Sequence, residues 1–181
     1  MRVGEPEFLA ALAKLLPRLR PKSRSPVRPF QTSDLNNCLK WLEAQSVGAD
    51  IRILWSAGRL EVQLGHPYAH TLVLEDGPNG GFINYYNIEM LGANELRVGV
   101  VDLFAGTLDF SQQLALLAAA CREMQEQQVH MAVMMKAASA PARVFIAAGF
   151  IPYPANVELF WYFTEPTLSI KPPVRYHVLF G

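Results

Sequence analysis

The sequence predicts a single domain of the α/β (α+β) class, built on a mixed sheet of six to seven strands. Strand and helix patterns alternate along most of the chain, which is typical of this class. The segment VHMAVMM at 129–135 is apolar without alternation, as expected for a strand covered on both faces. The 181 residues are 51% hydrophobic, enough to bury one sizeable core.

Charge and cysteine content exclude several classes of protein. Sixteen basic residues balance sixteen acidic ones, so no net charge draws the chain to nucleic acid or to an anionic membrane. Cys38 and Cys121 lie far apart in helical patterns, which favours two buried thiols over a disulfide or a zinc site. The chain shows neither a run of ~18 apolar residues nor the basic start of a signal peptide. We therefore expect a cytoplasmic protein with no nucleic acid and no membrane as partner.

The first 25 residues are expected to form a segment of their own. PEFLAALAKLL at 6–16 has one apolar helical stripe and ends at Pro17. The basic, proline-rich stretch at 18–28 is typical of a solvated linker, although its cations could also meet an acidic partner. The division is thus an N-terminal helix and basic linker at 1–25 and one domain at 26–181.

The main domain opens with a strand and two helices. VRPF at 27–30 is the expected strand, and Thr32, Ser33 and Asp34 are candidate N-caps of the first helix. The second helix is expected from Ile51 to Leu64. The inward positions expected in the two helices are Leu35, Cys38, Leu39 and Leu42, then Ile53, Leu54, Leu60 and Leu64.

A β-hairpin is predicted next. HTLVLED at 70–76 alternates as a strand does, and GFINYYNIEML at 81–91 is the returning strand. The intervening GPNGG at 77–81 suits a turn, which explains its glycines without a nucleotide.

The strand LRVGVVDLF at 96–104 leads through a small-residue loop into a helix. Asp109 and Gln112 form a D-x-x-Q capping box, and the expected inner positions are Leu114, Leu117, Ala118, Cys121 and Met124. Such a loop can hold a phosphate on free backbone N–H groups. Here Asp109 competes for those groups, and the chain has no Lys or Arg between Arg97 and Arg122. The backbone suits a phosphate, whereas the side chains do not favour one.

Four further elements complete the predicted order. After the strand at 129–135, SAPARVFIAAG at 139–149 reads as a helix with Pro141 in its first turn and Gly149 at its end. Strands are expected at 150–154 and 157–163, and the tail at 172–180 could add one more.

This order resembles the GNAT superfamily of acyltransferases, with this chain as a divergent member. The matching pieces are VRPFQTSDLNNCLKWL, GGFINYYNIE, LRVGVVDLF, LALLAAACREMQEQQVHMAVM and PARVFIAAGF, over roughly residues 26–165. The resemblance implies a GNAT-like three-layer fold with helices on both faces of the sheet. It also implies an acyl-CoA, acetyl-CoA or another, as cosubstrate, and direct transfer of the acyl group to an amine.

The resemblance also implies where acyl-CoA binds. The pantetheine arm would lie between the strand ending at Phe104 and the strand at 129–135, which splay apart. The family's pyrophosphate motif, Q/R-x-x-G-x-G/A, falls on Leu108, Ser111 and Gln113, none of which is the family residue. Lys136 and Arg143 are candidates to supply charge from the side. The implied cofactor-binding residues are Leu103, Phe104, Gly106, Thr107, Ser111, Gln112 and Gln113.

The catalytic positions of the family are altered too. Its tyrosine general acid, four residues before the closing glycine, is Phe145 here, which cannot donate a proton. Tyr153, or else Tyr85 or Tyr86, is the substitute to consider, although aromatic residues on strands are commonly core.

Two carboxylates are candidates for the general base. Asp102 ends an apolar strand, and Glu89 lies on the hairpin. Asp102 is either partly desolvated, with a raised pKa, or a solvent-facing residue at a strand end. The histidines show no metal-ligand spacing, since Pro67 argues against a helix joining His66 and His70.

Three hypotheses remain. The first is an N-acyltransferase acting on a small-molecule or peptide amine, with a degenerate pyrophosphate loop and with a homodimer allowed. The second is a catalytically inactive GNAT-like binding or scaffolding protein. The third is transfer from another carrier, such as an acyl carrier protein or an aminoacyl-tRNA, the latter disfavoured by the neutral charge.

Overall fold

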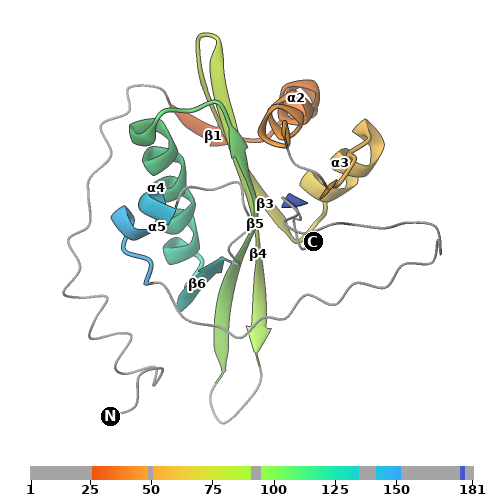
Figure 1. Ribbon diagram of the computed structural model, residues 1–181. Helices are drawn as coiled ribbons and strands as arrows, with labels where there is room; N and C mark the ends of the chain where they lie inside the picture. Colours follow the sequence, from red (N-terminus) through yellow and green to blue (C-terminus); the bar gives the residue numbers. More distant parts are fainter. Residues whose placement is uncertain (1–25, 49–50, 91–94, 135–141, 152–175, 178–181) are drawn as a thin grey trace.

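A computed structural model of the chain describes residues 26–48, 51–90, 95–134, 142–151 and 176–177 (Figure 1). Its main sheet has five strands in the order β1-β3-β4-β5-β6. The first four are antiparallel neighbours and β6 pairs parallel with β5, so the sheet is mixed, as predicted. These strands are β1 (Val27–Pro29), β3 (Ala69–Asp76), β4 (Asn79–Met90), β5 (Leu96–Gly106) and β6 (Met131–Met134).

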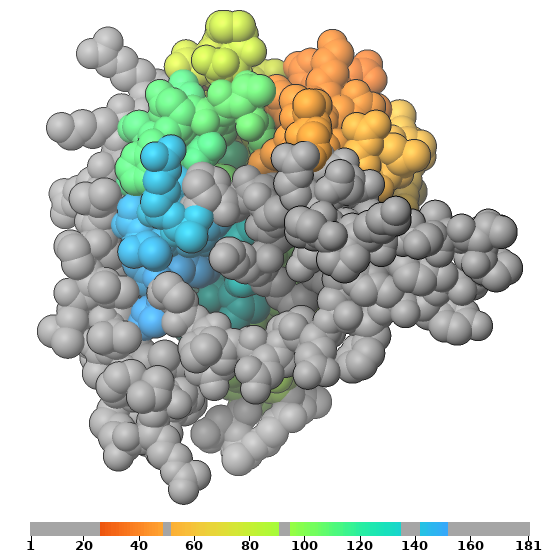
Figure 2. All heavy atoms as spheres, viewed as in Figure 1, coloured from red at the N-terminus to blue at the C-terminus, as the bar shows by residue number. Residues whose placement is uncertain are grey.

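Helices cover both faces of this sheet. In Figures 1 and 2, α2 and α3 lie together on one flank and α4 with α5 on the other. A second, two-stranded sheet pairs β2 in parallel with β7. The predicted α/β fold with helices on both faces is therefore confirmed. These elements are α2 (Leu35–Gln45), β2 (Ile51–Arg52), α3 (Ala57–Leu64), α4 (Phe110–Glu126), α5 (Ala142–Ala147) and β7 (Tyr176–His177).

Several predictions fall on residues that the structure does not describe. These are the helix at 6–16, the division at residue 25, the strand at 157–163 and most of the strand at 150–154. The tail adds β7, as the sequence suggested. β6 lies next to β5 as predicted, pairing Val98–Val101 with Met131–Met134. Their divergence beyond that point stays a prediction, because residues 135–141 lie outside the described part.

The two faces of the sheet hold separate hydrophobic clusters. Leu74, Tyr85, Val101 and Phe104 pack against α4 and α5. The cluster on the opposite face joins β3, β4 and β5 to α2 and α3 through Cys38, Trp41, Leu42, Leu60, Leu64, Val73, Phe82, Leu103 and Ala105. Burial raises the pKa of Cys38 to about 12, consistent with the buried thiol expected there.

The helix expected from Ile51 to Leu64 is shorter than predicted. Ile51 and Arg52 pair with β7, and α3 begins only after Ser56, whose side chain accepts a hydrogen bond from the Arg59 N–H at 3.2 Å. Leu60 and Leu64 are buried as expected. Leu54 is not an inward residue, since it precedes the helix and is 73% exposed.

Asp34 does not cap α2 with its side chain. Its carboxylate instead accepts two hydrogen bonds from the Arg28 guanidinium, at 2.6 and 2.8 Å, and one from the Gln31 N–H at 2.8 Å. The Arg28 bonds hold the pKa of Asp34 below its usual range despite burial. Arg28 also pairs with Glu75 at 2.8 Å, which ties β1 to β3.

β6 is less covered than its apolar sequence suggested. Within the described residues it is the last strand of the sheet, and its side chains are half-buried or exposed.

The helix α5 ends as predicted. Gly149 has φ +95°, the Phe150 N–H donates to the Phe145 carbonyl, and the two phenylalanine rings meet at 5.2 Å.

One residue of β5 has no partner in the ladder. Leu103 pairs with Asn84 and Val101 with Tyr85, so Asp102 is an insertion, a β-bulge. Leu103 packs on the α2–α3 side, and Asp102 bonds to α3, whereas Val101 and Phe104 face α4. The bulge thus directs two consecutive side chains to the same face.

Three glycines bring the end of β5 against the start of β4. A Cβ on Gly106 would lie 2.4 Å from the Gly80 carbonyl oxygen and 2.5 Å from Gly81 Cα. The Thr107 N–H donates to that same carbonyl at 2.8 Å. The loop before α4 is therefore fixed to the β3–β4 hairpin.

Gly106→Ala should lower the free energy of unfolding by about 1–3 kcal/mol, because the clashing atoms are backbone and cannot move aside. The matched control is Gly58→Ala on α3, where a Cβ meets nothing within 4 Å. It should raise stability by about 0.5–1 kcal/mol through helix propensity. Urea unfolding of both variants measures the difference; equal effects would contradict the close approach of β4 and β5.

Candidate functional site

Asp102 is buried at the β-bulge and faces α3. It is 9% exposed, and its carboxylate accepts a hydrogen bond of 2.5 Å from the Gln63 side-chain amide. Burial raises the pKa of Asp102, and the Gln63 hydrogen bond opposes part of that rise. Of the two alternatives that the sequence left open, the structure shows the desolvated carboxylate.

Other polar groups lie beneath α3 on the same face. The Tyr86 hydroxyl donates to the Gln63 backbone carbonyl at 3.2 Å, and burial, with the nearby Asp102 charge, raises the pKa of Tyr86. Asn84 is fully buried and donates to the Thr71 hydroxyl at 2.8 Å. Its carbonyl oxygen Oδ1 has no hydrogen-bond partner among the described residues. Asp102 therefore lies in a polar part of an otherwise apolar layer.

Sequence reasoning missed Gln63 and Asn84. Gln63 directly precedes Leu64 on the inner stripe of α3, which is the available signal that its side chain lies near the sheet. Asn84 interrupts the apolar residues of a strand, a signal of a buried polar contact.

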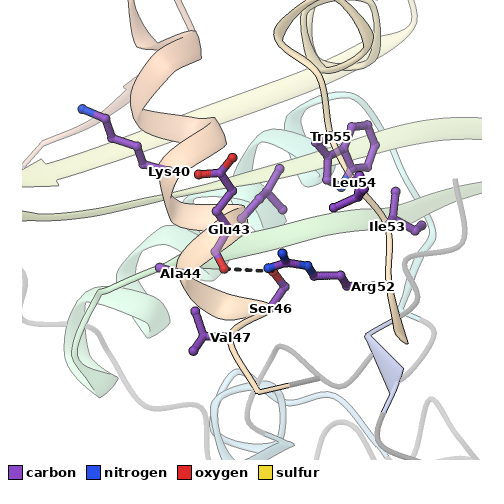
Figure 3. A pocket seen from close by; sticks show the side chains of 10 residues that line it. Lys40, Glu43, Ala44, Ser46, Val47, Arg52, Ile53, Leu54 and Trp55 are labelled. Carbon is purple, nitrogen blue, oxygen red and sulfur yellow. Dashed lines mark hydrogen bonds between the residues drawn. The ribbon is translucent and has the colours of Figure 1, made fainter. Parts of the chain in front are cut away.

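A pocket of about 490 Å³ opens between the end of α2 and the segment 52–55 (Figure 3). Of the residues that line it, Leu42 belongs to the hydrophobic cluster that contains Leu103, the neighbour of Asp102, and Ile53 and Trp55 pack against that cluster. The Gln45 side chain, in the last turn of α2, donates to the Phe104 carbonyl at 3.4 Å. This bond joins the last turn of α2, which lines the pocket, to the end of β5. The pocket is lined by Lys40, Leu42, Glu43, Ala44, Ser46, Val47, Arg52, Ile53, Leu54 and Trp55.

Leu103 and Phe104 are both buried, on opposite faces of β5. Leu103 packs toward α2 and α3, and the Phe104 ring meets that of Phe145 at 5.7 Å on the other side. Phe145, at the position of the family tyrosine, is thus a core residue. The Leu103 and Phe104 side chains fill the core, so any contact to a cosubstrate would come from their backbone.

The loop before α4 uses its own hydrogen-bonding groups. The Thr107 hydroxyl accepts from the Gly80 N–H at 3.3 Å. The capping box is confirmed: Asp109 accepts from the Gln112 N–H at 2.8 Å, and the Gln112 side chain accepts from the Asp109 N–H at 2.9 Å. These groups are therefore not free for a phosphate.

Further contacts close the same helix end. The Gln112 amide also donates to Asp76 at 2.6 Å, which brings a second carboxylate to the loop. Gln113 donates to the Leu108 carbonyl at 2.9 Å, and Ser111 is half-buried. One cation lies close by: the Arg143 guanidinium is 5.4 Å from the ring of Phe110, the first residue of α4.

The structure does not bring the remaining candidate site residues together around Asp102. Glu89 is an exposed residue that pairs with Arg97 at 2.9 Å. Arg97 and Asp102 are about 17 Å apart along β5 at ~3.4 Å per residue, so the structure does not bring Glu89 to Asp102. Tyr85 is buried on the α4 face and stacks on His70 at 4.9 Å. Tyr153 and Lys136 lie outside the described residues.

Across the described ranges, His, Cys, Asp and Glu form no group of three or more that could hold a metal ion. Within the same ranges, no helix has the length and apolar character needed to span a membrane.

Comparison with known proteins identifies the fold. No protein-family profile and no curated protein sequence matches the chain. Solved structures do match. A putative acetyltransferase from Agrobacterium tumefaciens is 9% identical, with a TM-score of 0.61 over 75% of this chain and 99% of that one. An acetyltransferase from Trypanosoma brucei is 12% identical, with a TM-score of 0.57 over 76% and 99%.

A transcriptional regulator from Bacillus halodurans has the same fold. It is 11% identical, with a TM-score of 0.63 over 76% of this chain and 100% of that one. The chain therefore has a GNAT-like fold, as the order of its elements suggested. At these identities the likeness concerns the fold alone.

Wild-type protein should bind acetyl-CoA weakly, with a dissociation constant above ~10 μM, because the capped end of α4 offers few free donors. Asp109→Asn keeps an oxygen for the Gln112 N–H and removes one negative charge. Affinity should then rise about two- to five-fold with the melting temperature unchanged. Calorimetry with acetyl-CoA measures both proteins; sub-micromolar binding by the wild type would contradict a closed helix end.

Proposed function

We propose that the protein is an acyl-CoA-dependent N-acyltransferase with Asp102 as its general base. The main support is a carboxylate held out of water at the bulge of β5, with a raised pKa, whose neighbour Leu103 shares a hydrophobic cluster with the pocket residue Leu42. A carboxylate that is purely structural is normally paired with a cation, as Asp34 is with Arg28. No ion pair of Asp102 occurs among the described residues.

The reaction needs one base and one departing thiolate. The amine nitrogen attacks the thioester carbonyl carbon, a C–N bond forms, and the C–S bond breaks. The amine proton passes to the Asp102 carboxylate, and the thiolate leaves with the electron pair of the C–S bond. A raised pKa makes Asp102 a stronger base than an exposed carboxylate.

Acyl-CoA would depend mainly on contacts other than the α4 N-terminus. The resemblance implies that the pantetheine arm lies between β5 and the strand that contains β6, and the described pairing of the two strands ends at Val101 and Met134. Arg143 beside Phe110 supports a phosphate contact from the side. The closed capping box and the two carboxylates explain why we expect this contact to be weak.

A second candidate function follows from that same closed helix end. A GNAT-like protein that binds a partner without catalysis needs no site for the CoA pyrophosphate. An enzyme that takes its acyl group from an acyl carrier protein or an aminoacyl-tRNA needs none either. The internal hydrogen bonds of Thr107, Asp109 and Gln112 favour these alternatives.

An assay of acyl transfer separates the two candidates. Purified protein is incubated with acetyl-CoA or longer acyl-CoAs and a panel of small-molecule and peptide amines, and release of free thiol is measured. The proposal expects turnover that falls at least about 100-fold in Asp102→Asn, consistent with loss of a general base. No turnover with any donor, in protein shown to be folded, would favour the binding protein.

Gln63→Leu should move the acidic limb of the pH–rate profile to higher pH. Turnover needs the Asp102 carboxylate, and the lost hydrogen bond had favoured that charged form, so the pKa of Asp102 rises further. Turnover above the new pKa should remain measurable. Val62→Ala, at an exposed position of the same helix, is the control and should leave the limb in place. An unmoved limb in Gln63→Leu would exclude Asp102 as the titrating group.

A further inference from the structure

The pocket between α2 and the segment 52–55 carries charges of both signs on opposite walls. Glu43 comes from α2, and Arg52 comes from the facing segment. Among the described residues neither side chain forms an ion pair. Arg52 makes one long hydrogen bond, 3.5 Å to the Ser46 hydroxyl, which leaves its other N–H groups for a ligand.

The pocket also has an apolar side that is open to solvent. Leu54 is 73% exposed and Val47 is 77% exposed, both at its margin. The Trp55 ring lines the same space, and the Arg59 guanidinium lies 5.0 Å from its centroid. Exposed apolar residues gathered at a concave site with a few charged groups are typical of a small-ligand site.

We propose that this pocket binds a free α-amino acid with an apolar or aromatic side chain. Arg52 can hold the carboxylate with two parallel hydrogen bonds, as a guanidinium does. Glu43 attracts the ammonium group from the other wall, and Leu54 and Trp55 contact the side chain. Opposite charges on facing walls match a zwitterion better than a simple amine or a simple acid.

A bound amino acid would also be an acyl acceptor for the proposed transferase. An amino acid carries an amine that an acyl group can modify, and Leu42, which lines the pocket, belongs to the same hydrophobic cluster as Leu103 beside Asp102. This step rests on the proposed function, whereas the binding itself does not.

Calorimetry with a matched set of ligands tests the proposal. The probes are L-phenylalanine and L-leucine, phenethylamine, which lacks the carboxylate, 3-phenylpropanoate, which lacks the amine, and glycine, which lacks the side chain. The two amino acids should bind at least about ten-fold more tightly than each of the other three. Peptides that begin or end in phenylalanine lack one of the two charges at that residue and should bind as weakly as the single-charge probes.

Three variants test which residue of the pocket contacts each charged group of the amino acid. Arg52→Gln should lose the contact to the carboxylate, so it should bind L-phenylalanine no more tightly than phenethylamine. Glu43→Gln should lose the attraction for the ammonium group, so it should bind L-phenylalanine no more tightly than 3-phenylpropanoate. Arg122→Gln is the control, because Arg122 is an exposed cation on α4, which lies on the other side of the sheet from the pocket. Melting curves establish that each variant is folded before its binding is compared.

The outcomes separate the binding site from the proposed reaction. Binding of amino acids that survives in Asp102→Asn, with turnover lost, supports both. Binding without turnover in the wild type keeps the site and removes the reaction. No amino-acid binding at millimolar ligand, or binding that is indifferent to both Arg52→Gln and Glu43→Gln, overturns the site whether or not other amines are acylated.

Discussion

The extra residue in β5, opposite the junction of Asn84 and Tyr85, decides which side chains meet which helices. Side chains alternate along a strand, so the insertion places Asp102 and Leu103 on one face and Phe104 on the other. If Asp102 instead paired in the ladder as a regular residue, every residue from Leu103 to the end of the strand would lie on the opposite face, and both hydrophobic layers would lose their packing. The same insertion leaves a carboxylate within the α2–α3 layer.

Two buried carboxylates in this protein show how surroundings set their chemistry. Asp34 receives two hydrogen bonds from the Arg28 guanidinium, which lower its pKa, and it joins β1 to the helix that follows. Asp102 receives a hydrogen bond from the neutral Gln63 amide, and burial raises its pKa. The first arrangement favours the charge and stabilises the fold. The second disfavours the charge, which costs stability and suits a group that takes up a proton.

Features encoded by a few neighbouring residues were predictable from the sequence. The Gly77 turn of the hairpin, the Asp109–Gln112 capping box and the Gly149 helix end each depend on local backbone chemistry, and all three are confirmed. Contacts between distant segments were not predictable. The bulge depends on the register with β4, and Gln63 meets Asp102 across 39 positions of the chain. Asp102 itself was identifiable as a carboxylate within an apolar strand.

The carboxylate of Asp102 is held in the core with a raised pKa. The direct measurement is the free energy of unfolding of wild type and Asp102→Asn from acidic to neutral pH. Since the folded pKa exceeds the unfolded one, the stability that protonated Asp102 contributes is complete below the unfolded pKa and is lost as pH rises through the folded pKa. Asp102→Asn should therefore gain stability relative to the wild type across that interval, by about 1.4 kcal/mol for each unit of pKa difference. A difference that does not change with pH would contradict a raised pKa and with it the assignment of Asp102 as the base.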